Sequence, residues 1–189
     1  MFVRACKILR SREREIFDTL REKVYTTFPK ETVAFLKREL DRFENPLAHR
    51  LEEGLKGLVA LFGEEEFSWE KADYYLDRLI KIEAVQSRKP SEGLAFLFFL
   101  KSAIREVAGE EILARFGPEG LLEVEDYVDA LTLRAFNHYL AAREKLNELK
   151  FQEWKSRLFL LLKRAGYLYD EREGSLAPET ALDHNENPH

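Results

Sequence analysis

Seven consecutive apolar residues, Leu94 to Leu100, constrain the fold of this chain more than any other stretch. A helix that faces solvent could not carry such a run, and Lys101 and Arg105 end it well short of the roughly 20 residues that a bilayer span requires. We therefore predict a central, fully buried helix. Its start at Pro90 is favoured because proline at the first helical position loses no hydrogen bond, and we expect Gly109 to end it.

Apolar residues at steps of three and four predict helices along the rest of the chain, and no strand pattern competes with them. We expect helices at about residues 8–27, 30–43, 46–62 and 69–86, a turn at 110–116 that leads to Gly117-Pro118, and a last helix at 121–167. Asn45 before Pro46, and Ser68 before Trp69, are typical of helix starts. The sequence therefore predicts an all-α fold with a long C-terminal helix.

The length of the last helical pattern is itself a constraint. At about 1.5 Å per residue the helix would extend ~70 Å, which exceeds a domain of this size, so its second half must project, bend or pair. Phe151, Trp154, Leu158 and Leu161 recur at steps of three and four, the spacing of a short coiled-coil seam. Two alternatives are equally open: pairing with another molecule, including a homodimer, or folding back on the same chain.

These patterns divide the chain into three parts. We expect a helical domain at residues 1–150, an extension of the last helix at 151–168 that forms the dimer or partner seam, and a tail at 169–189. The tail is polar and acidic and contains two prolines, a composition that favours disorder.

The net charge of −5 is concentrated in this tail. Residues from Asp170 onward hold six acids and one base, whereas the preceding 169 residues hold 29 acids and 29 bases. Because acids and bases are equal in number in these 169 residues, we expect them to lack the clustered basic face that nucleic-acid binding requires. Residues 1–20 have no apolar segment of a signal peptide, and the single cysteine, Cys6, fits a reducing compartment. We therefore expect a cytoplasmic protein with no membrane insertion and no nucleic-acid partner.

The chain carries no motif that predicts catalysis, a metal site or a cofactor. No Gly-rich phosphate loop has the required spacing. His49 lies off the leucine stripe of its helix, and we expect it at the surface. His138 lies at the edge of an inward face, where we favour a half-buried, hydrogen-bonded side chain over a metal or haem ligand. We therefore predict a non-enzymatic protein without catalytic or metal-ligating residues.

Five residues are candidates for a core or a pocket: Gly54, Gly57, Gln86, Phe96 and His138. Each of the two glycines lies inside a predicted helix, where it costs roughly 1 kcal/mol relative to alanine. Such a cost is offset either by the close approach of two helices, which we favour, or by a place in the wall of a small cavity. The Gln86 amide would either fasten the end of one helix to the start of the central helix or face solvent. Both alternatives are equally open.

Several stretches, in their order and spacing, resemble one known family. They are Tyr25–Phe43 (YTTFPKETVAFLKRELDRF), Asn45-Pro46 with Glu53-Gly54, Ile82–Gln86 (IEAVQ), Pro90–Lys101 (PSEGLAFLFFLK), Ala135-Phe136 and Arg143-Glu144-Lys145. Together they resemble the N-terminal domain of the RsbT co-antagonist (RsbRD-type) proteins of the bacterial stressosome, over roughly residues 12–163.

The resemblance implies a globin-like sensory domain without haem, a bundle of about six to seven helices that is commonly joined to an output module. The chain also resembles stand-alone copies of this domain in sulfate-reducing bacteria, where such copies accompany sulfite-reduction genes. We expect the chain to depart from the family in having no output module. It also departs at Glu83, where a basic residue is expected, and at Lys89, where serine or a similar cap is expected.

Two functions follow as hypotheses. The favoured one is a regulatory domain that acts by protein–protein interaction through the late helix around Trp154, on a protein partner of unknown identity. The alternative is a globin-related sensor that binds haem or another small molecule. A globin's proximal histidine would fall within Glu83–Gln86, which contain no histidine, and this absence disfavours haem.

Overall fold

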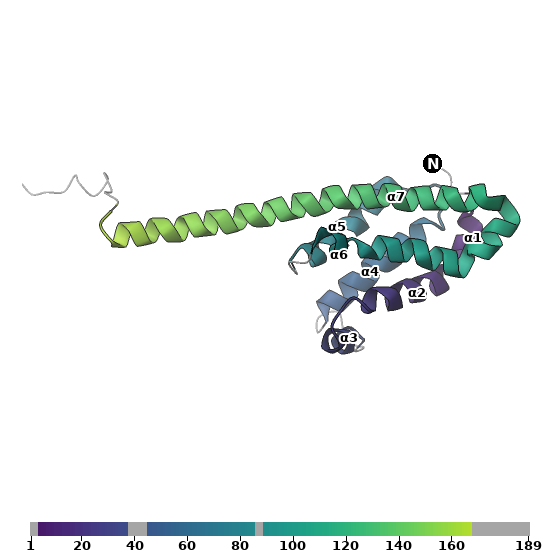
Figure 1. Ribbon diagram of the computed structural model, residues 1–189, viewed down its shortest axis with the longest axis horizontal. Helices are drawn as coiled ribbons and strands as arrows, with labels where there is room; N and C mark the ends of the chain where they lie inside the picture. The colour runs from purple at the N-terminus through teal and green to yellow at the C-terminus, as the bar shows by residue number, and fades with distance from the viewer. Residues whose placement is uncertain (1–3, 38–44, 86–88, 168–189) are drawn as a thin grey trace, which may run out of the picture. The chain divides into compact units, whose positions relative to one another are not determined.

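Helices make up all the regular secondary structure of the residues that the structure describes. The computed structural model describes residues 4–37, 45–85 and 89–167. The helices are α1 (Cys6–Ser11), α2 (Glu13–Tyr25), α3 (Lys30–Leu36), α4 (Pro46–Leu61), α5 (Trp69–Val85), α6 (Pro90–Gly93) and α7 (Ala95–Arg164), as labelled in Figure 1. The prediction of an all-α fold with a long C-terminal helix is confirmed for these residues.

The chain divides into two units, Met1–Leu146 and Asn147–His189. The first unit contains α1 to α6 and the larger part of α7, and the second begins inside α7 and is described as far as residue 167. Apolar residues at steps of three and four along the second half of α7 form the predicted inward stripe: Val124, Val128, Leu131, Ala135, Tyr139, Ala142, Leu146 and Leu149. This stripe is buried up to Tyr139 and partly buried at Ala142 and Leu146, whereas Leu149 is 55% exposed. The burial of this stripe therefore ends with the first unit.

Three predicted helix starts are confirmed by the hydrogen bonds around them. The side chain of Asn45 accepts the backbone N–H of Ala48 at 3.1 Å and donates to the carbonyl of Phe35 at 3.0 Å, so this buried amide both caps α4 and ties it to α3. Ser68 Oγ accepts the backbone N–H of Lys71 at 3.3 Å at the start of α5. At Pro90, which begins α6, the carboxylate of Glu92 accepts the backbone N–H of Lys89 at 3.4 Å. The central helix predicted from Pro90 is nevertheless interrupted at Leu94 (φ −103°, ψ 0°), so α6 ends at Gly93 and the long helix α7 begins at Ala95.

The helix predicted at 8–27 is two helices, because the backbone leaves helical geometry at Arg12 (φ −107°, ψ 8°). Ser11 Oγ donates to the carbonyl of Ile8 at 2.8 Å, a local bond that competes with helix continuation. The break lets Cys6, Ile8 and Leu9 all reach the core. Of the helix predicted at 30–43, the structure shows α3 at 30–36, and residues 38–44 lie outside the described part of the chain.

The prediction that the apolar run Leu94–Leu100 is buried throughout is wrong at three positions, because Ala95 and Phe99 are only partly buried and Phe98 is exposed. Leu94, Phe96, Leu97 and Leu100 are buried, but Phe98 is 57% exposed. An α-helix has about 3.6 residues per turn, so any run of seven residues presents some side chain to the outer face of a helix that is covered on one side. Within α7 the run therefore combines buried side chains of the inner face with the partly buried Ala95 and Phe99 and the outward Phe98.

Gly109 does not end the helix, and the turn predicted at 110–116 is wrong because those residues are helical. Gly109 and Ile112 are both buried, so packing against the core outweighs the weak helix preference of glycine here. The interruption comes later, at Gly117, whose φ of 68° and ψ of −172° lie outside helical geometry.

Gly117 joins two arms of α7 that lie side by side in the first unit (Figure 1). Lys101 on the first arm contacts Asp129 on the second at 2.5 Å. Arg105 on the first arm donates through both Nε and Nη2 to the buried carboxylate of Glu125, the latter at 2.8 Å. The reversal at Gly117 therefore makes α7 pack against itself.

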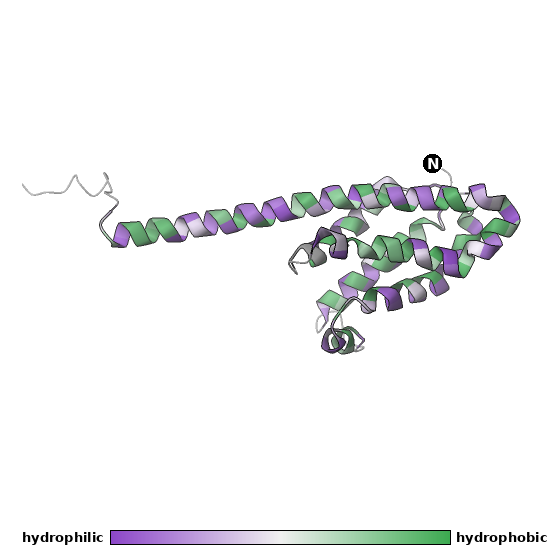
Figure 2. Ribbon diagram, viewed as in Figure 1, coloured by the Kyte–Doolittle hydropathy of each residue, from purple (hydrophilic) through white to green (hydrophobic). Residues whose placement is uncertain are grey.

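The core of the first unit gathers side chains from its long helices. Its fully buried members include Leu20, Leu55, Leu58, Leu76, Leu97, Leu100, Leu131 and Tyr139. Phe67 adds edge-on contacts to Phe62 and Trp69, with ring centroids 5.3 Å and 4.8 Å apart. Figure 2 shows hydrophobic and hydrophilic residues alternating along α2 and α4, as expected of helices with one covered face. None of the described helices combines the length and apolar content that crossing a membrane requires.

Candidate functional site

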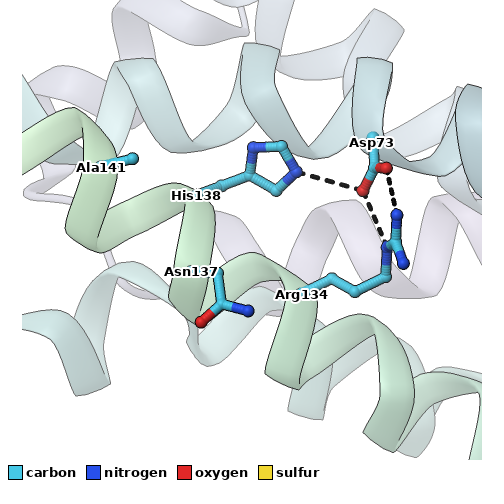
Figure 3. Close-up of a pocket in the computed structure, with 5 residues that line it drawn as sticks. All are labelled: Asp73, Arg134, Asn137, His138 and Ala141. Carbon is cyan, nitrogen blue, oxygen red and sulfur yellow. Dashed lines mark hydrogen bonds and ion pairs between the residues drawn. The ribbon is translucent and has the colours of Figure 1, made fainter.

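A polar hollow of about 350 Å³ opens on the first unit between α5 and the second arm of α7. Asp73 of α5 and Arg134, Asn137, His138 and Ala141 of α7 line it (Figure 3). The four residues from α7 share one face because residues three and four apart on a helix are neighbours. The hollow is thus built from one carboxylate on one helix and from three polar side chains and an alanine on another.

The interactions between the lining residues converge on the carboxylate of Asp73, as Figure 3 shows. Arg134 donates to both of its carboxylate oxygens, with Nε 2.8 Å from Oδ1. His138 Nε2 lies 3.1 Å from the same Oδ1. The guanidinium carbon of Arg134 also lies 5.2 Å from the centroid of the Trp69 ring, within the range of a cation–π contact. One carboxylate therefore fastens α5 to two successive turns of α7.

The electrostatics of the cluster favour a permanently charged pair. The hydrogen bonds from Arg134, and secondarily the bond from His138, lower the pKa of the Asp73 carboxyl, although burial opposes them. The hydrogen bond to Asp73 raises the pKa of the Arg134 guanidinium. A general acid or base needs a pKa near the working pH. An Asp73 that stays ionised and is already bonded on both oxygens is suited to holding helices together, not to proton transfer.

His138 matches the interpretation that we favoured from the sequence. Its side chain is 32% exposed and is hydrogen-bonded to Asp73. His49 is at the surface as expected, 45% exposed and 4.0 Å from Glu53. No group of three or more potential metal ligands occurs within residues 4–37, 45–85 and 89–167.

The two glycines of α4 serve the close approach of α4 and α5. A Cβ added at Gly54 would lie 2.7 Å from the side chain of Leu79, and one at Gly57 would lie 2.3 Å from the ring of Tyr75. Both distances are too short for real carbon–carbon contacts. The interpretation that these glycines allow two helices to approach closely is therefore confirmed. The alternative, that they form the wall of a small cavity, is not, because side chains of α5 fill that space.

Of the five candidate core or pocket residues, only His138 lines the hollow. Phe96 is buried in the core, and Gln86 lies outside the described residues. Sequence reasoning missed Asp73 and Arg134. Arg134 and His138 are four residues apart, a spacing that puts both on one helix face, but nothing local to α7 reveals that the carboxylate they share comes from α5.

The predicted seam consists of exposed side chains in the second unit. Phe151 is 56% exposed, Trp154 61%, Leu158 39% and Leu161 62%. Their neighbours Phe159 and Leu160 are also exposed, and Figure 2 shows a strongly hydrophobic stretch near the C-terminal end of α7. Exposed apolar clusters of this kind are typical of interaction surfaces.

A second exposed apolar stripe lies on the first unit and was not foreseen. Leu133, Phe136 and Leu140 of α7 are 71%, 44% and 42% exposed. They recur at steps of three and four, as the buried residues Val128, Leu131 and Ala135 do, so the periodicity alone does not distinguish the two faces. This part of α7 contains two sets of apolar residues, one buried and one exposed. The presence of a second set is the signal in the sequence that could have revealed the exposed stripe.

Comparison with known proteins identifies the family. A family model described as the RsbT co-antagonist protein rsbRD N-terminal domain matches residues 14–153, which is most of the first unit and the beginning of the second. Neither the curated proteins nor the solved structures compared with the chain gave a match. The chain therefore belongs to the family of RsbT co-antagonist protein rsbRD N-terminal domains.

Proposed function

We propose that the chain is a non-enzymatic regulatory domain that acts by docking the late part of α7 on a protein. Membership of the rsbRD N-terminal domain family supports a regulatory role in general. The observation that carries the docking surface is the exposure of Phe151, Trp154, Leu158 and Leu161. Covering apolar surface gains about 25 cal/mol per Å², so a seam of large side chains has a strong tendency to be covered.

The polar hollow supports the non-enzymatic part of the proposal. Asp73 is held by Arg134 and His138, and each of these contacts joins α5 to α7. A catalytic carboxylate would need a free oxygen and a pKa near the working pH, whereas the pKa of Asp73 is lowered. The cluster is therefore best explained as a structural clamp within the sensory unit.

Other parts of the proposal come from the family resemblance and from the sequence. They are a globin-like arrangement, a cytoplasmic location and a link to sulfite reduction. The partner of the seam is a second copy of the chain or a different protein.

The test changes the seam without changing the helix. The double variant Trp154→Glu/Leu158→Glu places two charges in the seam, and the matched control Gln152→Glu/Ser156→Glu places two charges at the same spacing on another face of the same helix. Each tagged chain is produced in its own host and its complexes are weighed by native mass spectrometry, with helix content checked by circular dichroism.

We expect the wild-type chain and the control to retain a second copy or a partner of the same mass, and the seam variant to lose it. Helix content should be equal in all three, because glutamate is a good helix former. Equal masses for the seam variant and the wild type would contradict the proposed docking surface.

A further inference from the structure

The charges beside the seam indicate which kind of partner it takes, and this inference rests on the proposed docking of the late helix. Lys150, Arg157 and Arg164 follow one another at steps of seven residues. Seven residues make nearly two helical turns, so the three bases lie along one side of the helix. We call these three residues the basic edge. Residues 147–167 as a whole hold five bases and two acids, a net charge of +3.

The basic edge borders the seam directly. In a heptad where Phe151 and Leu158 occupy position a and Trp154 and Leu161 occupy position d, all three bases of the basic edge fall at position g. Positions g and e flank the apolar contact of a coiled coil and decide partner choice and orientation. The flanking e positions here are Glu148, Lys155 and Leu162.

A second copy of the chain offers the basic edge no acid in either orientation. In an antiparallel pair the g positions of the two helices face each other, so basic edge would meet basic edge. In a parallel pair each g position faces the e position five residues later on the partner helix. Lys150 would then meet Lys155, and Arg157 would meet Leu162. Like charges at such positions oppose association.

We infer that the seam docks on an acidic amphipathic helix of a different protein, with an apolar stripe for the seam and carboxylates for the basic edge. Arg157 is 2.5 Å from Glu153 on its own helix, but both side chains are strongly exposed, at 74% and 60%. Such a pair is screened by water and exchanges readily for a carboxylate at an interface. The basic edge is therefore available to a partner.

A membrane surface fits the seam less well than a protein does. A helix that lies on a membrane buries one face and keeps the opposite face polar. Leu149 and Leu160 lie on the side of the helix opposite the seam, and each is 55% exposed. The helix therefore lacks the uniformly polar opposite face of a membrane-surface helix, and binding to an anionic membrane is an outcome of the test and not part of the inference.

The experiment measures the charge preference of the seam in the full chain. Two synthetic helical peptides of four heptads serve as probes, both with leucine at positions a and d, one with glutamate and the other with lysine at positions e and g. Binding of each labelled peptide is followed by fluorescence anisotropy at about 0.05 M and about 0.5 M salt. The proteins are the wild type, the edge variant Lys150→Glu/Arg157→Glu/Arg164→Glu, and the seam variant Trp154→Glu/Leu158→Glu.

We expect the wild type to bind the glutamate peptide at least about tenfold more tightly than the lysine peptide at low salt, and the edge variant to reverse this order. The difference should shrink at high salt because exposed charges are screened. Equal affinities for the two peptides in both proteins would overturn the inference. So would co-sedimentation of the wild type with mixed phosphatidylcholine and phosphatidylserine vesicles that the glutamate peptide fails to compete away.

Failure of this inference is distinguishable from failure of the proposed function. If the wild type is a homodimer in light scattering that the seam variant breaks and the edge variant leaves unchanged, the docking surface stands and the acidic partner is wrong. If the seam variant behaves like the wild type with both peptides and in mass, the docking surface itself is wrong.

Discussion

At the scale of single residues, three helical glycines of the first unit have different roles. Gly54 and Gly57 lie against side chains of α5 that leave no room for a Cβ. A Cβ at Gly109 would meet its nearest neighbour, Arg105, at 3.9 Å, an ordinary contact. The same residue type therefore packs two helices together in one case and only weakens a helix in the other.

Replacing Gly54 by alanine should destabilise the fold by about 1–2 kcal/mol, because overpacking against buried Leu79 outweighs the gain in helix preference. Gly109→Ala is the control, and we expect it to stabilise the fold by about 0.5–1 kcal/mol. Urea unfolding followed by circular dichroism measures both free energies. Stabilisation by Gly54→Ala would show that α4 and α5 are not in close contact there.

The clamp at Asp73 makes a prediction about pH. Because Arg134 first and His138 second lower the pKa of Asp73 in the folded state, the ionised carboxylate contributes stability above its unfolded pKa, near 3.9, and this contribution is lost as pH falls through the lower folded value. Asp73→Asn should therefore cost about 0.5–1 kcal/mol at neutral pH. The difference from the wild type should begin to shrink below about pH 4 and should disappear only when the pH is below the lowered pKa of Asp73 in the folded state. Urea unfolding at a series of pH values measures it, and a difference that does not vary with pH would contradict the clamp.

At the scale of elements, the reversal at Gly117 determines how α7 is used. With φ at 68° and ψ at −172°, this residue has a backbone conformation that is essentially restricted to glycine. The reversal brings Lys101 to Asp129 and Arg105 to Glu125, contacts that a straight helix would not make. A single glycine thus converts one helical pattern into two packed arms.

Gly117→Ala should destabilise the first unit by about 1–3 kcal/mol, the usual cost of a strained backbone conformation. Apart from the adjacent part of the chain, no atom of the described residues lies within 4 Å of the added Cβ, so the loss would come from the backbone conformation and not from a clash. Thermal unfolding of the variant beside Gly109→Ala, which adds the same methyl group inside a regular helix, separates the two causes. An unchanged melting temperature for Gly117→Ala would mean that the chain reverses in some other way.

At the scale of the whole molecule, the two described histidines are placed unfavourably for haem. His138 is bonded to Asp73 and His49 is at the surface. We therefore expect no Soret band when the chain is expressed with haem supplied, measured by absorbance beside a globin control. A Soret band that survives purification would favour the globin-related sensor over the docking domain.

The sequence by itself determined the features that depend on neighbouring residues. Helical periodicity, the starts at Asn45 and Ser68 and the all-α class follow from side chains within a few positions of one another, and the structure confirms them. The spacing of the seam around Trp154 is also local, and its role stays a prediction. The basic edge is local as well, because the seven-residue spacing of its three bases is visible in the sequence alone.

Only the tertiary structure decided the features that depend on residues far apart in sequence. Asp73 and Arg134 are 61 positions apart, and neither carries a local sign of its partner. Gly54 and Gly109 look alike until the neighbour of each is known. The helix end expected at Gly109 occurs at Gly117 because core packing of α7 outweighs the local preference of glycine. Local sequence sets which helices form, but the contacts between helices fix where they turn and which side chains meet.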